Sequence, residues 1–164
     1  METKTIFRYP TALTIAGSDS SGGAGIQADL KTFSALGVFG ASVITAITAQ
    51  NTQEVRGIQV VSPDILQAQL DAIFDDLEID AIKTGMIPDC KSVKIIADVL
   101  SHASPLPFVI DPVMISTSGK RLIDEEAVKI MQKELFPLAT LITPNIEEVE
   151  YLTGYTILSD TDME

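Results

Sequence analysis

The stretch from Leu13 to Asn51 constrains the fold more than any other part of the chain. A short apolar run from Ala12 to Ala16 is followed by a polar turn and then by Gly22, Gly23 and Gly25. The glycines open an amphipathic segment whose apolar residues recur at helical spacing: Ile26, Leu30, Phe33 and Leu36. This pattern predicts a strand, a glycine-rich turn and a helix. Such a turn lets the backbone approach a ligand closely, and free N–H groups at a helix start favour anions or polar atoms.

The glycine spacing leaves two other interpretations open. Gly23-x-Gly25-x-x-Ala28 fits the dinucleotide-binding fingerprint, which also requires an acidic residue at the end of the second strand. Here Gln50 and Asn51 follow that strand, and Glu54 lies further on, in the turn. The glycines also fit a purely structural role in a tight turn.

Asp29 and Gln50 are candidate ligand-binding residues near this turn. Asp29 lies early in the predicted helix among apolar neighbours, where it is either a solvated first-turn charge or a carboxylate directed at a ligand's hydroxyl or amino group. Gln50 follows the next strand, and its amide offers one acceptor and two donors, which suits an aminopyrimidine edge. Both residues are therefore expected at one crevice.

Composition narrows the class of protein. A chain of 164 residues with 46% apolar residues is sufficient for one domain with a real core. Its apolar runs are short, and neither a membrane span nor a signal peptide is expected, which favours the cytoplasm. The formal net charge of −12 argues against nucleic acid as a partner. Cys90 is the only cysteine and His102 the only histidine, which excludes an internal disulfide and multi-histidine zinc sites. We interpret both as structural.

Strand and helix patterns alternate along the chain. Strands are predicted at 12–16, 39–49, 55–61, 79–83, 108–111 and 140–143, with the 55–61 strand short and at an edge. Helices are predicted after Gly25, from Pro63 to about 78, from Pro88 to about 103, from Ile123 to about 136 and over 146–152. This order predicts an α/β fold with a mostly parallel sheet covered by helices on both faces.

Polar residues cluster where the predicted strands end. The five clusters are Gly17-Ser18-Asp19, Gln50-Asn51, Lys83-Thr84-Gly85-Met86, Asp111 and Asn145. Ligands in such sheets bind outside the carboxyl ends of the strands, so these residues predict one crevice.

Two further segments have patterns that are typical of known structural features. Ser118-Gly119-Lys120 is similar to the end of a P-loop, but Arg121 stands where Ser or Thr is needed and Met114 where the first glycine belongs. The final residues, from Ser159 to Glu164, have the pattern of a helix start, which indicates a truncated chain.

Several motifs in order resemble the hydroxymethylpyrimidine/phosphomethylpyrimidine kinases of thiamine biosynthesis. They are Thr14 to Phe33, Val43 to Thr52, Lys83 to Met86, Asp111 to Met114 and Thr143 to Glu148. The resemblance extends from about Ala12 to the end of the chain. It implies a ribokinase-like fold, a three-layer α/β/α sandwich, as a single domain over 1–164. It also implies ATP and Mg²⁺ as cofactors, a small pyrimidine substrate and a homodimer.

The resemblance also implies roles for individual residues. Gly17, Asp29 and Gln50 would bind the pyrimidine and its hydroxymethyl group, and Met86 and Val113 would line the apolar side of the pocket. The residues expected beside the ATP phosphates and the Mg²⁺ shell are Asp111, Asn145 and Glu148, of which Asp111 and Glu148 would serve the metal. These assignments agree with the crevice expected at the strand ends.

The sequence departs from the family in one respect. The family uses a glycine-rich anion hole followed by a Cys or Asp base, Gly-x-Gly-Cys or Gly-x-Gly-Asp, and none of the 164 residues form that motif. Cys90 lies in the wrong context to supply the base. We therefore expect a kinase of hydroxymethylpyrimidine and its monophosphate whose catalytic base lies beyond Glu164. The alternatives are a pyridoxal/pyridoxine kinase of the same fold and a non-catalytic pyrimidine-binding module.

Overall fold

A computed structural model describes residues 8–103, 105–114, 123–159 and 162. Six strands form one sheet in the order β3-β2-β1-β4-β5-β6. Their bounds are Thr11–Asp19 (β1), Phe39–Gln50 (β2), Val55–Val60 (β3), Ala81–Thr84 (β4), Phe108–Ile110 (β5) and Leu141–Ile142 (β6). All neighbouring pairs are parallel except β2 and β3, which are antiparallel. The predicted edge strand at 55–61 is thus confirmed.

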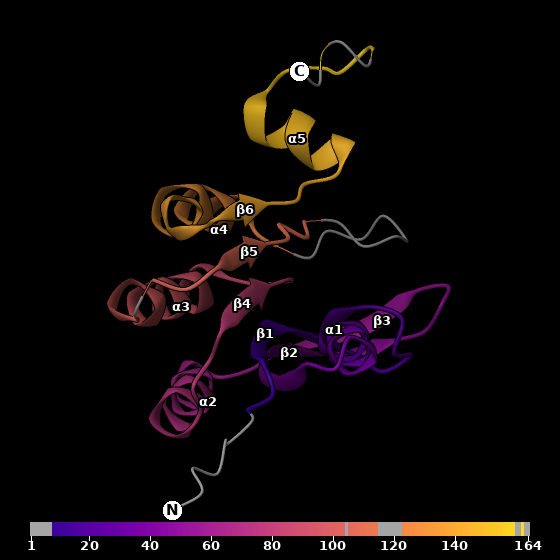
Figure 1. Ribbon diagram of the computed structural model, residues 1–164. Helices are drawn as coiled ribbons and strands as arrows, with labels where there is room; N and C mark the ends of the chain where they lie inside the picture. Colours follow the sequence, from indigo (N-terminus) through magenta and orange to yellow (C-terminus); the bar gives the residue numbers. More distant parts are fainter. Residues whose placement is uncertain (1–7, 104, 115–122, 160–161, 163–164) are drawn as a thin grey trace, which may run out of the picture.

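The helices cover both faces of this sheet (Figure 1). Helix α1 (Gly25–Ala35) packs on β1 and β2, whereas α2 (Pro63–Asp76), α3 (Cys90–His102) and α4 (Glu125–Ile130) pack in sequence along the opposite face. Helix α5 (Ile146–Thr153) lies beyond β6. The three layers confirm the predicted α/β class.

The chain reverses its direction of travel across the sheet at β1. Helix α1 connects β1 to β2 on one side, and β4, on the other side of β1, is reached later through β3 and α2. Right-handed crossovers in opposite directions place α1 and α3 on opposite faces. The carboxyl ends of β1 and β4 therefore border a topological switch point, where such sheets bind ligands. The antiparallel β3 distinguishes this sheet from the parallel halves of dinucleotide-binding folds.

The core lies between the sheet and the α2–α4 layer. Its fully buried side chains include Leu13, Ile15 and Val43 from the sheet and Leu66, Leu70 and Ile96 from the helices. The helical residues recur at spacings of three or four, so each helix turns one apolar stripe inward.

Most observed bounds lie within about two residues of the sequence-based ones, as for β4, α2 and α3, and the differences that follow are the most informative. Strand β1 continues past Ala16 to Asp19, with a register shift between Ala16 and Ser18, so part of the expected turn is strand. The helix predicted over 123–136 begins at Glu125 and continues as a π-helical segment (Met131–Leu135) and a short 3₁₀ helix (Phe136–Leu138). The last strand is shorter than predicted. The loop at 115–122 and most of the C-terminal helix start lie outside the described residues.

In the described part of the chain, no helix combines the length and the apolar character needed to cross a bilayer.

Candidate functional site

The glycine-rich loop is organised around the side chain of Asp19. Its Oδ2 accepts hydrogen bonds from the backbone N–H groups of Gly23 (3.0 Å) and Ala24 (2.8 Å), and its Oδ1 accepts one from the N–H of Ser21 (2.8 Å). Burial alone would raise the pKa of Asp19, but the hydrogen bonds from Ser21, Ala24 and Gly23 outweigh it and hold that pKa below 3.8. The anion bound by these N–H groups is thus the chain's own carboxylate.

Gly25 joins the loop to the first strand. Its φ of +57° is left-handed, and it forms an isolated bridge with Ser18. A Cβ on Gly25 would also collide with the carbonyl oxygen of Gly17. Only glycine satisfies both conditions, because other residues are strained at such a φ and carry a Cβ. Gly25 thereby fixes the start of α1 against the end of β1.

A cavity of about 260 Å³ opens at the switch point. The ends of β1, β2, β4 and β5 and the start of α1 surround it. All five residues expected to bind substrate line it, together with one expected at the phosphates: Gly17, Asp29, Gln50, Met86, Val113 and Asp111. Gly17 contributes by its lack of a side chain, because a Cβ there would lie 2.7 Å from Met86 Cε.

Three charged side chains from three elements meet in this cavity. The Lys83 ammonium on β4 lies 3.1 Å from Asp29 Oδ2 on α1 and 3.7 Å from Asp111 Oδ2, which follows β5. Thr14 Oγ1 donates to the same Asp29 oxygen at 2.6 Å. Burial raises the pKa of Asp111, the Lys83 charge opposes that rise, and the Asp29 carboxylate adds to it. The cluster carries one positive and two negative charges in a partly buried site.

Gln50 closes the cavity from β2. Its backbone N–H donates to Ser20 Oγ at 2.9 Å, and Ser20 Oγ in turn donates to the Gln50 carbonyl at 2.6 Å. The side-chain Oε1 lies 3.2 Å from Thr48 Oγ1, whose single proton is shared with the closer carbonyl oxygen of Ser18 at 2.8 Å. This contact leaves the amide group of Gln50 with two donors for a ligand.

Asn145 and Glu148 are not among the cavity-lining residues. They form a capping box at the start of α5: Glu148 N–H donates to Asn145 Oδ1 at 2.9 Å, and Asn145 N–H donates to Glu148 Oε2 at 3.0 Å. Glu148 Oε1 also accepts from the N–H of Met114 at 3.2 Å, and its side chain is buried. Glu148 thus ties α5 to the loop after β5.

The carboxylates expected at the metal lie in different environments. No group of three or more His, Cys, Asp or Glu residues suited to a metal exists in the part of the chain that the structure describes. Mg²⁺ commonly uses one or two carboxylates, substrate phosphates and water. Asp111, which lines the cavity, fits that mode, whereas both oxygens of Glu148 accept backbone hydrogen bonds.

Cys90 and His102 lie at the two ends of α3, away from the cavity-lining set. Burial raises the pKa of the Cys90 thiol, and Glu126 and Asp124 raise it further. His102 Nδ1 lies 2.7 Å from the carbonyl oxygen of Asp98 in the last turn of α3. Neither residue lines the switch-point cavity, and their structural roles stay predictions.

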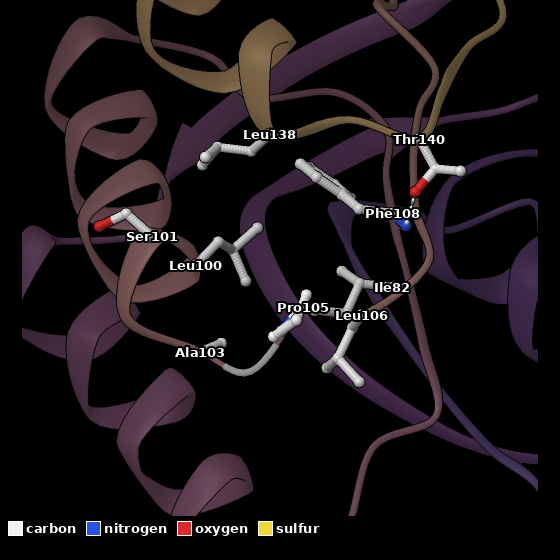
Figure 2. A pocket seen from close by; sticks show the side chains of 9 residues that line it. All are labelled: Ile82, Leu100, Ser101, Ala103, Pro105, Leu106, Phe108, Leu138 and Thr140. Atoms are coloured by element: carbon white, nitrogen blue, oxygen red, sulfur yellow. Dashed lines mark hydrogen bonds between the residues drawn. The ribbon is translucent and has the colours of Figure 1, made fainter.

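A second cavity, of about 420 Å³, lies at the opposite, amino-terminal end of β5 (Figure 2). Its lining is mostly apolar and includes Ile82, Leu100, Leu106, Phe108 and Leu138, with Ser101 and Thr140 as polar members. Thr140 Oγ1 already accepts from the N–H of Phe108 at 3.1 Å. None of the nine lining residues is charged, so the smaller cavity is the better candidate for phosphoryl chemistry.

Sequence reasoning underestimated three residues of the site. Lys83 was noted only as one of several polar residues at a strand end, and Thr14 lies within an apolar run that gives no sign of a polar role. Asp19 was placed in the crevice, but its role in holding the loop was not predicted. The Asp-Ser-Ser-Gly-Gly pattern was an available signal, because Asp side chains commonly accept from backbone N–H groups two residues on.

Comparison with known proteins agrees with this architecture. The Phosphomethylpyrimidine kinase family matches residues 19–164. The hydroxymethylpyrimidine/phosphomethylpyrimidine kinase of Rhizobium meliloti (strain 1021) is 54% identical over 149 residues, which are 91% of this chain and 56% of that protein. The chain thus spans little more than half the length of this curated relative.

Solved structures of kinases share the fold of this chain. The phosphomethylpyrimidine kinase of Clostridium difficile 630 has a TM-score of 0.87 at 51% identity, over 94% of this chain and 67% of that one. The pyridoxal kinase of Staphylococcus aureus, in complex with AMP-PCP and pyridoxal, has a TM-score of 0.83 at 36% identity, over 96% of this chain and 56% of that one. The fold is that of the ribokinase-like class. Within that class, the chain belongs to the phosphomethylpyrimidine kinase family.

Proposed function

We propose that this chain forms the substrate-binding part of an ATP-dependent kinase that phosphorylates 4-amino-5-hydroxymethyl-2-methylpyrimidine and its monophosphate in thiamine biosynthesis. The observation that carries this proposal is the cavity at the switch point, where Asp29, Gln50 and Met86 converge from three elements. A carboxylate suits a ligand hydroxyl, and an amide suits an aminopyrimidine edge. Membership of the family supports the same substrate.

The phosphate side of the reaction would lie next to Asp111. When bound, ATP would supply the phosphoryl group and Mg²⁺ would neutralise its charge, so the protein's task is mainly positioning. Besides Asp29, the described carboxylates that line the cavity are Asp19 and Asp111. Asp19 is held by the loop N–H groups, so Asp111 is the better Mg²⁺ ligand. The S. aureus relative solved with AMP-PCP supports ATP as the donor. Asn145 is proposed beside the ATP phosphates and Glu148 at the Mg²⁺ shell, as the resemblance implies, and their capping box would also fix the loop after β5.

The catalytic base is proposed to lie outside these 164 residues. A Gly-x-Gly-Cys or Gly-x-Gly-Asp motif is absent from the sequence, because Gly23-x-Gly25 is followed by Ile26. We therefore expect the isolated chain to bind substrate but to give no turnover with Mg-ATP in a coupled ADP-release assay. A clear steady-state rate that scales with the concentration of this chain would contradict the assignment of the base.

A pyridoxal kinase is the second candidate, favoured by the likeness to the S. aureus enzyme solved with pyridoxal. Both ligands are flat nitrogen heterocycles with a hydroxymethyl group. Calorimetric competition separates the two: we expect pyridoxal, added at a concentration equal to that of the pyrimidine, to leave most of the heat of pyrimidine binding unchanged. Complete displacement at equal concentration would favour the pyridoxal kinase.

Isothermal titration with the hydroxymethylpyrimidine tests the proposal itself. We expect the wild-type chain to bind, and Asp29→Ala and Gln50→Ala each to weaken binding by about tenfold or more, because each removes a ligand-facing polar group. Lys94→Met on the exposed face of α3 is the control and should bind as the wild type does. Binding that is unaffected by both cavity variants would contradict the proposed site.

Two further properties are proposed: a homodimeric state, which the resemblance implies, and a cytoplasmic location, which the sequence features favour. Sedimentation velocity over a range of concentrations tests the first. A species of 17.6 kDa at all concentrations would contradict a dimer of this chain.

A further inference from the structure

Lys83 occupies a central place in the cavity that the proposed roles do not use. It lies on β4, between β1 and β5, in register with Thr14 on one side and Val109 on the other. Its side chain is 22% exposed, and its ammonium lies 3.1 Å from Asp29 Oδ2 and 3.7 Å from Asp111 Oδ2. The ammonium thus lies between the carboxylate on the substrate side and the carboxylate on the phosphate side.

The two oxygens of Asp29 are in different situations. Thr14 Oγ1 and Lys83 Nζ both donate to Oδ2, and these two donors come from register partners on adjacent parallel strands. For Oδ1, the described residues supply no hydrogen bond. A carboxylate held at one oxygen by two donors has a fixed plane, so its second oxygen has a defined direction.

The local backbone leaves room for the ammonium. A Cβ on Gly85 would lie 3.0 Å from Lys83 Nζ and 3.1 Å from the Cβ of Ala16. Both distances are shorter than ordinary van der Waals contact, so a methyl group at this position would require its neighbours to move by a few tenths of an ångström. Lys83 is confined by Asp29 on one side and by Gly85 on another.

We propose that Lys83 is a positioning residue that fixes the Asp29 carboxylate toward the substrate's hydroxyl group and thereby selects ligands that carry a hydroxymethyl substituent. This inference rests on the proposed function, because it assumes that Asp29 accepts the ligand hydroxyl. Lys83 itself acts through Asp29. A residue that only balanced the charges of two carboxylates would affect stability and overall affinity but not the choice between a ligand with the hydroxyl and one without it.

Calorimetry with two ligands tests this distinction. The ligands are 4-amino-5-hydroxymethyl-2-methylpyrimidine and 4-amino-2,5-dimethylpyrimidine, which differ only in that hydroxyl. We expect the wild-type chain to prefer the first by about tenfold or more, as for a hydrogen bond to a charged group. In Lys83→Met the preference should fall to about twofold or less, while the affinity for the dimethyl ligand changes little. Lys83→Gln, which keeps an N–H donor, should restore part of the preference, and Lys94→Met should keep all of it.

The outcomes separate this inference from the proposed function. If the wild type binds neither ligand, the proposed function and the inference about Lys83 are both wrong. If it prefers the hydroxymethyl ligand and Lys83→Met keeps that preference, only the role of Lys83 fails. Thermal unfolding of each variant shows whether it is folded. Should Lys83→Met fail to fold, Lys83→Gln takes its place, because it lacks the charge and the reach of the ammonium, and a preference equal to that of the wild type would equally overturn the inference.

Discussion

At Gly25 a left-handed backbone and a close approach to β1 coincide, whereas Gly37 has only the first. The φ of Gly37 is +72°, and an added Cβ there meets nothing within 4 Å. We expect Gly37→Ala to cost about 1 kcal/mol in free energy of unfolding, and Gly25→Ala to cost about 3 kcal/mol or more because the Gly17 carbonyl must also shift. Urea denaturation measures both. Equal losses of unfolding free energy in the two variants would show that the close contact between Gly25 and the Gly17 carbonyl does not add to the cost.

The buried hydroxyl groups of Thr84 and Thr45 differ in their hydrogen bonding. Both are fully buried, but Thr45 Oγ1 donates to the Met86 carbonyl at 2.7 Å, whereas Thr84 Oγ1 has no hydrogen-bond partner among the described residues. An unpaired buried hydroxyl is unfavourable. Thr84→Val should therefore raise the free energy of unfolding by about 1 kcal/mol, and Thr45→Val should lower it by a similar amount. A loss of stability in Thr84→Val would indicate that its hydroxyl does have a partner.

At the scale of elements, the glycine-rich loop depends on one ionised side chain. Because the pKa of Asp19 is lowered in the folded state, its stabilising effect is present above the unfolded value of 3.8 and is lost as the pH falls through the folded pKa. We expect Asp19→Asn to be about 2 kcal/mol less stable than the wild type at pH 7. That difference should shrink when urea denaturation is repeated below pH 3.8. A constant difference would exclude the charge of Asp19 as its source.

The two residues of the capping box are expected to contribute unequally to the stability of helix α5. Asn145→Ala removes one cap and should cost about 1 kcal/mol. Glu148→Ala should cost about 2 to 3 kcal/mol, because it leaves the N–H groups of Asn145 and Met114 without acceptors. Glu147→Ala, at an exposed position in the same turn, is the control and should change stability by less than about 0.5 kcal/mol. Circular dichroism during urea unfolding gives all three values, and a Glu148→Ala loss no larger than that of Asn145→Ala would contradict the second role of Glu148.

At the scale of the whole molecule, the alternation of patterns was sufficient to predict the sheet and the edge at which its polar residues meet. Lys83 and Asp29 are 54 positions apart in sequence, and their contact depends both on the register of β4 with β1, which pairs Lys83 with Thr14, and on the packing of α1 against β1. The π-helical segment at Met131–Leu135 was not predicted, because helical periodicity does not distinguish it from an ordinary helix. The two backbone hydrogen bonds that Glu148 accepts were not predicted either, because one of them comes from Met114, which is 34 positions away in sequence.

The central claim is that the cavity at the switch point, and not the larger apolar one, binds the pyrimidine. A crystal structure of this 164-residue chain grown with 4-amino-5-hydroxymethyl-2-methylpyrimidine tests it most directly. We predict the ring between Met86 and Val113, with its hydroxyl at Asp29 and its amino edge at Gln50. Density for the pyrimidine in the cavity lined by Leu100, Phe108 and Leu138, with the switch-point cavity free of ligand, would contradict the account.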